Sequence, residues 1–123
     1  MIDSDTIDWQ IVEIVDKWLD GNVSNQYKDQ PLAQDWARIC KLIEEMGETV
    51  SNLILFTGQN PRKQCINPDV TETEMLLEMA DVVMTGILGI QHFTKDIWIT
   101  KQIIQSSMTK IGNRVNENSK TKA

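Results

Sequence analysis

Residues 75–90 read Met75-Leu-Leu-Glu-Met-Ala-Asp-Val-Val-Met-Thr-Gly-Ile-Leu-Gly-Ile90. Apart from Glu78 and Asp81 this stretch has no charged side chain, and its apolar residues cover nearly the whole circumference of a helix. A helix that is apolar all round is normally buried, so the stretch predicts an internal helix of a helical fold. Glu78 and Asp81 are three residues apart, which places both carboxylates on one face of that helix.

Two ionised carboxylates in apolar surroundings cost several kcal/mol unless they are neutralised. Protonation, a lysine or arginine, or a divalent cation can neutralise them. Residues 75–90 contain no lysine or arginine. We therefore favour a divalent cation bound by Glu78 and Asp81 over a structural ion pair.

Four helices are predicted where apolar residues recur with helical spacing, over residues 7–19, 31–57, 72–93 and 95–111. Asp8 or Thr6 caps the first helix, and Pro31 suits the first turn of the second, where its missing N–H costs nothing. Gly58 ends the second helix, and residues 58–70 form an ordered loop.

The third predicted helix opens with a Thr71–Glu74 capping box, and Gly112 ends the fourth. Nothing alternates with period two over the length of a strand, so the predicted fold class is all-α and four-helix-bundle-like. We expect one domain over residues 1–112, followed by a polar tail over residues 113–123 that frays.

The chain has 123 residues and a net charge of −6, from 18 acidic and 12 basic side chains. Such an acidic surface repels phosphate backbones, so duplex nucleic acid and anionic membranes are not expected partners. Two cysteines are too few for a disulfide framework. The acidic start lacks the order of a signal peptide, and no apolar run is long enough to span a membrane. We expect a cytoplasmic protein.

A second acidic motif, Glu44-Glu45-Met-Gly-Glu48, lies on the second predicted helix. Taken alone, it fits a solvated polar face better than a site. If it faces Glu78 and Asp81 across a helix contact, the two motifs supply oxygen ligands without imidazole or thiolate. Such ligands suit Mg²⁺ or Mn²⁺ and do not select zinc. A ferritin-like di-iron site needs Glu-x-x-His motifs, and the only histidine, His92, has Gly89 three residues before it.

The combination of Glu44-Glu45-x-x-Glu48 and Glu78-x-x-Asp81 resembles the signature of the MazG-like, all-α nucleoside triphosphate pyrophosphohydrolases. The resemblance covers about residues 31–114. It implies a MazG-type fold and Mg²⁺-dependent hydrolysis between the α and β phosphates of a (d)NTP or related nucleotide, giving a monophosphate and pyrophosphate. It also implies that Glu45, Glu48, Glu78 and Asp81 bind the metal, with Glu44 and Glu45 as catalytic residues. Glu44 is then a further ligand, a water-orienting group or a base.

Basic residues must neutralise the phosphate charge that the metal ion leaves. Lys110 and Arg114 resemble basic residues late in the last helix of the family, although cations also favour any helix C-terminus. Arg62 and Lys63 either close over the substrate or belong to a solvated loop. Lys41 is expected to pair with Glu45 four residues later.

The remaining apolar pattern predicts packing rather than chemistry. Trp9, Trp18, Trp36 and Cys40 fall on apolar stripes, so we expect core positions for them. The apolar surface of the second and third helices exceeds what four helices of one short chain can cover. We therefore expect a homo-oligomer, a dimer or a tetramer, with helices packed between subunits.

Two functions of different classes remain from the sequence. One is a nucleotide pyrophosphohydrolase that cleanses nucleotide pools or controls a nucleotide signal. The other is a non-catalytic helical module that binds a nucleotide or metal and acts through partners. The full set of five acids favours the enzyme.

Overall fold

The computed structural model describes residues 6–121, in which all regular structure is helical. The elements are α1 (Trp9–Gly21), a 3₁₀ turn η1 (Asn25–Tyr27), α2 (Pro31–Thr57), α3 (Pro68–Thr94) and α4 (Ile97–Thr121). The predicted all-α class is confirmed. None of the helices in the described range is long and apolar enough to cross a membrane.

The bounds of α1 and α2 follow from local chemistry. Asp8 caps α1 as predicted, because its carboxylate accepts hydrogen bonds from the N–H groups of Gln10 and Ile11. Pro31 occupies the first turn of α2. Gly58 follows the last turn with φ of 73°, a left-handed conformation that a residue without Cβ adopts readily.

The predicted start of the third helix and end of the fourth are wrong. Helix α3 begins at Pro68, because the Asn67 side chain accepts a hydrogen bond from the Val70 N–H and displaces the expected Thr71 capping box. Helix α4 continues through Gly112 to Thr121, into the stretch expected to fray. A single glycine costs a helix only about 1 kcal/mol, so it does not by itself end one.

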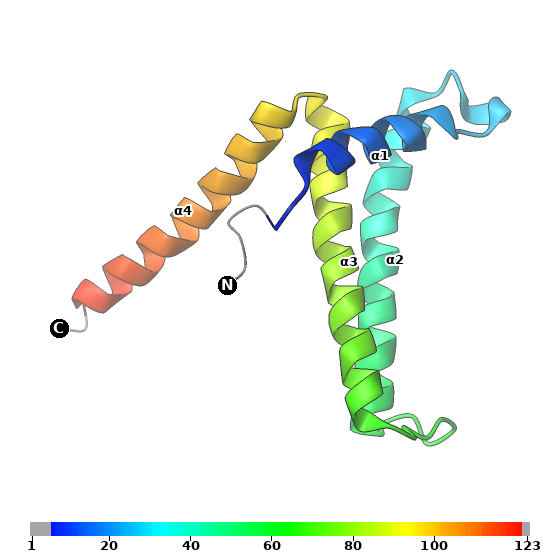
Figure 1. The fold of residues 1–123 in the computed structure, drawn as a ribbon, viewed down its shortest axis with the longest axis vertical. Coiled ribbons are helices and arrows are strands. Elements are labelled where there is room, and N and C mark those ends of the chain that lie inside the picture. Colours follow the sequence, from blue (N-terminus) through cyan, green and yellow to red (C-terminus); the bar gives the residue numbers. More distant parts are fainter. Residues whose placement is uncertain (1–5, 122–123) are drawn as a thin grey trace.

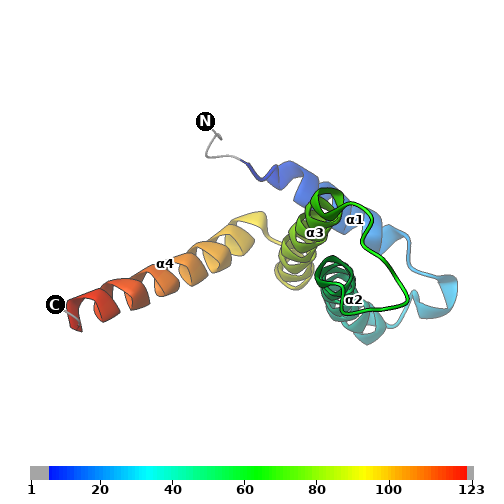
Figure 2. The same ribbon diagram turned by 90° about the horizontal axis from the view of Figure 1, so that it is seen from below.

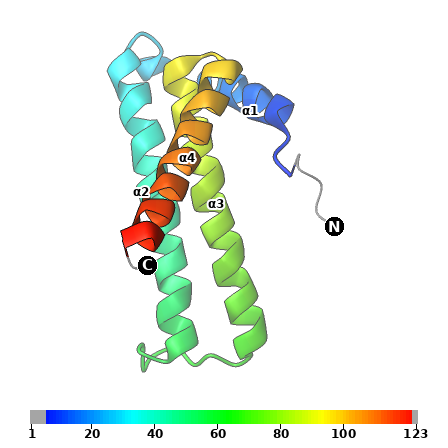
Figure 3. The same ribbon diagram turned by 90° about the vertical axis from the view of Figure 1, so that its left-hand side faces the viewer.

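Helices α2 and α3 form an antiparallel pair joined by residues 58–67 at one end (Figure 1). Helix α1 crosses the pair at the other end. Viewed from below, α4 points away from the other helices as an arm (Figure 2). The side view shows α2 and α3 running alongside each other over most of their lengths (Figure 3). The α2–α3 pair therefore carries both acidic motifs, and α1 covers one end of the pair.

Helix α4 leaves α3 through a defined corner. Lys95 adopts the left-handed conformation with φ of 53°, and Asp96 caps α4 by accepting from the Trp98 N–H at 2.9 Å. Buried Thr100 donates to Gln91 of α3 at 2.7 Å. Lys101 lies over the rings of Trp9, at 5.5 Å, and Trp98, at 4.9 Å. These contacts hold the start of the arm.

Few apolar side chains are buried in the described chain. Val12 and Ile87 are the only buried hydrophobic residues in that range. The prediction of an internal third helix is wrong for the single chain, because much of the apolar surface of α3 is exposed. The core positions expected for Trp18, Trp36 and Cys40 are also wrong, because these three side chains are exposed as well. Helical spacing identified the apolar faces, but this chain alone does not cover them.

Candidate metal centre

The two acidic motifs meet because of the register of the α2–α3 pair. Thr57 ends α2 and Pro68 begins α3, so these residues lie at about the same level. Glu48 lies nine residues before Thr57 and Glu78 ten residues after Pro68. With an equal rise per residue in both helices, Glu48 reaches the level of Glu78, and Glu45 that of Asp81. The i, i+3 spacing on each helix then turns four carboxylates toward one place.

The side chains show this convergence. One carboxylate oxygen from each of Glu45, Glu78 and Asp81 lies within 4.8 Å of the other two. Glu48 lies next to them, because both Glu78 and Glu45 act on the pKa of its carboxyl group. We call Glu45, Glu48, Glu78 and Asp81 the carboxylate cluster. Three of the four residues predicted as metal ligands are thus brought together, and the fourth, Glu48, lies beside them.

The carboxylate cluster contains unsatisfied oxygens. Glu45 is buried and Glu78 half-buried, and the Oε2 atom of each has no hydrogen-bond partner in the described chain. The Nζ atom of Lys41 lies 3.2 Å from Oε1 of Glu45, which neutralises part of the charge. A buried carboxylate oxygen without a partner is costly. An oxygen-preferring divalent cation would supply the missing partner, so the residues fit Mg²⁺ or Mn²⁺.

The neighbouring carboxylates shift the pKa of Glu48. Its pKa is raised above the ordinary value of 4.5, first by the hydrogen bond with Glu78 and then by the charges of Glu45 and Glu78. When Glu48 is ionised, it is repelled by its neighbours in the folded chain. Ionisation of Glu48 therefore costs free energy in the folded chain.

The raised pKa of Glu48 predicts how stability changes with pH. An acid whose pKa is higher in the folded state destabilises the fold once it is ionised. The cost is absent below the ordinary pKa of 4.5 and grows as pH rises through the raised value. In EDTA, Glu48→Gln should therefore be more stable than the original chain at pH 7 and equal to it near pH 4. Urea unfolding at several pH values measures this difference, with exposed Glu72→Gln as control. A Glu48→Gln chain that is less stable at pH 7 would contradict it.

Glu44 lies beside the carboxylate cluster rather than in it. Its Oε1 atom accepts from Lys41 Nζ at 3.1 Å, and its side chain is exposed. The hydrogen bonds with Glu44 and then Glu45 raise the pKa of Lys41. The predicted pairing of Lys41 with Glu45 is confirmed.

The structure does not bring the four expected phosphate-binding cations to the carboxylate cluster. Arg62 and Lys63 lie in the loop beyond Gly58, about 15 Å along α2 from Glu48 at 1.5 Å per residue. Lys110 and Arg114 lie on the arm, where Lys110 is about 20 Å from the start of α4. Among the residues that the structure describes, Lys41 is the basic residue that contacts the cluster.

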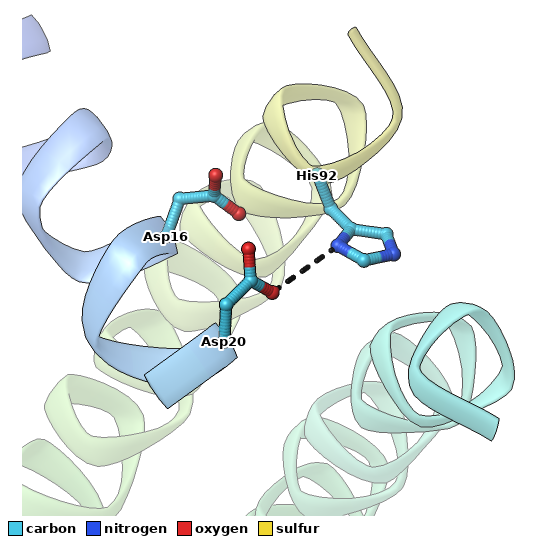
Figure 4. Close-up of side chains that lie close together, drawn as sticks. All are labelled: Asp16, Asp20 and His92. Carbon is cyan, nitrogen blue, oxygen red and sulfur yellow. Dashed lines mark ion pairs between the residues drawn. The ribbon is translucent and has the colours of Figure 1, made fainter. Parts of the chain in front are cut away.

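A second acidic group, which was not predicted from the sequence, lies where α1 crosses the pair. Asp16 and Asp20 of α1 approach His92 near the end of α3 (Figure 4). Asp20 Oδ1 lies 3.6 Å from His92 Nδ1, and His92 Nε2 lies 2.7 Å from Asp35 Oδ1. The four residues come from three helices, so helical spacing along one of them could not reveal the group.

Two cations already balance this second group. Arg38 contacts Asp16 at 3.0 Å and Asp20 at 3.2 Å, and Lys95 Nζ contacts the same carboxylates at 2.8 and 2.6 Å. Burial works to raise the pKa of Asp20, but Lys95 and Arg38 outweigh it and lower this pKa. Burial likewise opposes the charge of Lys95, whose pKa is nevertheless raised by Asp16 and Asp20. The group is thus an ion-pair network that joins α1 to the α2–α3 pair.

A pocket of about 640 Å³ lies between this network and the carboxylate cluster. Its walls come from α1, the segment around η1, α2 and α3, and are mainly apolar. Tyr27, Gln34 and Thr85 add polar groups, and Lys41 lines the pocket while contacting Glu45. A pocket of this size accommodates an organic group that carries a few hydrogen-bonding atoms. Its walls come from residues 15–27, 33–41 and 85–89, so no single stretch of the sequence indicates the pocket.

Comparison with known proteins finds no match to this chain among family models, curated proteins or solved structures.

Proposed function

We propose that this chain is a Mg²⁺-dependent nucleotide pyrophosphohydrolase with a MazG-type fold, which cleaves a (d)NTP or related nucleotide between its α and β phosphates. The convergence of Glu45, Glu78 and Asp81, with Glu48 beside them and buried oxygens left unpaired, carries the proposal. The resemblance of the two acidic motifs to the MazG-like signature supports the same reaction.

The donor set supports the choice of metal. The carboxylate cluster offers oxygen atoms alone, from residues that suit a hard cation. Mg²⁺ held by carboxylates usually retains waters and binds substrate phosphates. When bound, the ion would neutralise phosphate charge and lower the pKa of a coordinated water.

The residues around the carboxylate cluster divide the other tasks. Lys41, which lines the pocket, neutralises part of the phosphate charge. Glu44 orients or deprotonates the attacking water. The water oxygen bonds to the α-phosphorus, and the bond from that phosphorus to the bridging oxygen breaks, which releases pyrophosphate. The pocket would hold the nucleoside, because Lys41 places it directly beside the cluster.

The test is product analysis with the full chain. It would be incubated with the common NTPs and dNTPs in Mg²⁺, and monophosphate, pyrophosphate and orthophosphate would be quantified. We expect equal amounts of monophosphate and pyrophosphate from at least one nucleotide, and no products in EDTA. In ¹⁸O-labelled water, the label should enter the monophosphate, because attack is at the α-phosphorus.

Two results would overturn this proposal. Orthophosphate as the first product would place the attack at the terminal phosphate. Inertness toward every nucleotide, with Mn²⁺ as well as Mg²⁺, would leave the non-catalytic binding module as the better description.

A further inference from the structure

A positively charged side chain of the protein itself lies against the carboxylate cluster. The Nζ atom of Lys41 is 3.1 Å from Oε1 of Glu44 and 3.2 Å from Oε1 of Glu45. Glu45 follows Lys41 by four residues on α2, about one helical turn, so Lys41 reaches both glutamates from the same helix. The charge of Glu45 is thus partly neutralised without a metal ion.

Lys41 and a metal ion would compete for Glu45. This carboxylate contacts the ammonium group, and it is also one of the three whose oxygens lie within 4.8 Å of one another. A divalent cation bound there would lie close to the ammonium group, and like charges at short range repel strongly. Lys41 therefore has to leave Glu45, or it weakens the metal site by staying.

The surroundings of Lys41 allow it to leave. Its side chain is 52% exposed, whereas that of Glu45 is 11% exposed. Lysine carries its charge on a flexible stem of four carbons, so the ammonium group can move while α2 stays in place. Ion pairs that involve such exposed side chains are weak, so little holds Lys41 against a divalent cation.

The pocket indicates the direction of that movement. Lys41 lines the pocket of about 640 Å³ and contacts Glu45 of the carboxylate cluster, so it lies at the boundary between the two. With the nucleoside in the pocket and the metal ion on the cluster, the phosphate at this boundary is the α-phosphate, which is attached to the nucleoside. The negatively charged oxygens of that phosphate are strong acceptors for an ammonium group.

We propose that Lys41 is an exchangeable counter-ion, which pairs with Glu45 in the metal-free chain and moves to the α-phosphate when the metal ion and the nucleotide bind. The exchange also releases Glu44, whose Oε1 atom accepts a hydrogen bond from Lys41, for its role toward the attacking water. The metal ion then binds weakly to the chain alone and more tightly with the nucleotide, because the nucleotide gives Lys41 another partner. This inference rests on the function proposed above.

Binding of Mn²⁺ without nucleotide tests the first half of the exchange. The electron spin resonance signal of free Mn²⁺ would be titrated with the full chain, and Glu78→Gln should lower the affinity if the ion is at the cluster. Lys41→Met should bind Mn²⁺ about fivefold more tightly or better, because the repelling charge is gone. Lys41→Arg keeps the charge and should bind no more tightly than the original chain. Lys17→Met removes an exposed lysine of α1 and should leave the affinity unchanged.

Binding of nucleotide analogues tests the second half. In the α,β-methylene analogues of the common NTPs and dNTPs, a carbon replaces the bridging oxygen, so the bond stays intact and calorimetry in excess Mn²⁺ measures binding alone. For the analogues that bind the original chain, Lys41→Met should raise Kd about tenfold or more, as expected for a lost hydrogen bond between charged groups. The same substitution therefore shifts the two affinities in opposite directions.

The outcomes separate this exchange from the proposed function. If Lys41→Met binds Mn²⁺ no more tightly than the original chain, the ammonium group does not compete with the metal ion, and the exchange is wrong although the metal centre stands. If Lys41→Met binds the analogues as tightly as the original chain does, Lys41 does not reach the phosphate, and the exchange is wrong as well. If the original chain binds no Mn²⁺, or no analogue, the proposed function itself fails and the exchange fails with it.

Discussion

Glu78→Gln and Asp81→Asn should each lower kcat/KM for nucleotide hydrolysis by about 100-fold or more, the cost of removing one electrostatic contact from a transition state. Each substitution keeps the shape of the side chain but removes a charge that the proposed Mg²⁺ requires. Steady-state pyrophosphate release at several Mg²⁺ concentrations measures the effect. Glu72→Gln, on the exposed surface of the same helix, should leave the rate unchanged.

The same two variants separate a metal centre from a structural network. Without metal, the carboxylate cluster is a set of mutually repelling acids, so neutralising one of them should leave stability equal or higher. Urea unfolding in EDTA measures this. If both variants lose activity together with several kcal/mol of stability, the cluster holds the helices together and the catalytic interpretation fails.

Arg38→Met should lower the free energy of unfolding by about 2 kcal/mol, the typical contribution of hydrogen bonds between charged groups. Its guanidinium contacts Asp16 at 3.0 Å and Asp20 at 3.2 Å, and Asp16 is only 3% exposed. Lys95 alone would then have to balance both carboxylates. Chemical denaturation at fixed protein concentration checks the loss, with exposed Lys17→Met as the control.

A double variant distinguishes lost charge pairing from lost packing. Asp16→Asn removes the buried charge that Arg38 balances. The Asp16→Asn/Arg38→Met chain should therefore be more stable than the sum of the two single losses predicts, by about 1 kcal/mol or more. Additive losses would mean that Arg38 stabilises the chain through its aliphatic stem.

The carboxylate cluster could be anticipated from sequence because its determinants are local. The i, i+3 spacing sets which way each carboxylate points, and Pro31 and Gly58 mark the ends of α2. The connection between α2 and α3 is short, so the two helices are antiparallel and the register of the acids follows. Within the α2–α3 pair, the start of α3 was misplaced, because Asn67 supplies the cap there.

The ion-pair network and the arm were not predictable in the same way. Asp16 and Lys95 are 79 positions apart, and nothing in either segment indicates that they meet. The direction of α4 depends on Lys95 adopting a left-handed conformation, which a lysine rarely does. Helical periodicity identified the apolar face of α2 but carries no information on which neighbour covers it.

The scarcity of fully buried apolar side chains has a calorimetric consequence. Heat capacity rises on unfolding in proportion to the apolar surface that becomes hydrated. A solitary chain, in which Val12 and Ile87 are the only buried hydrophobic residues among residues 6–121, already hydrates a large part of that surface before it melts. The free energy of unfolding of the solitary chain should therefore vary almost linearly with temperature. That of an assembled species should show the curved temperature dependence of an ordinary globular domain.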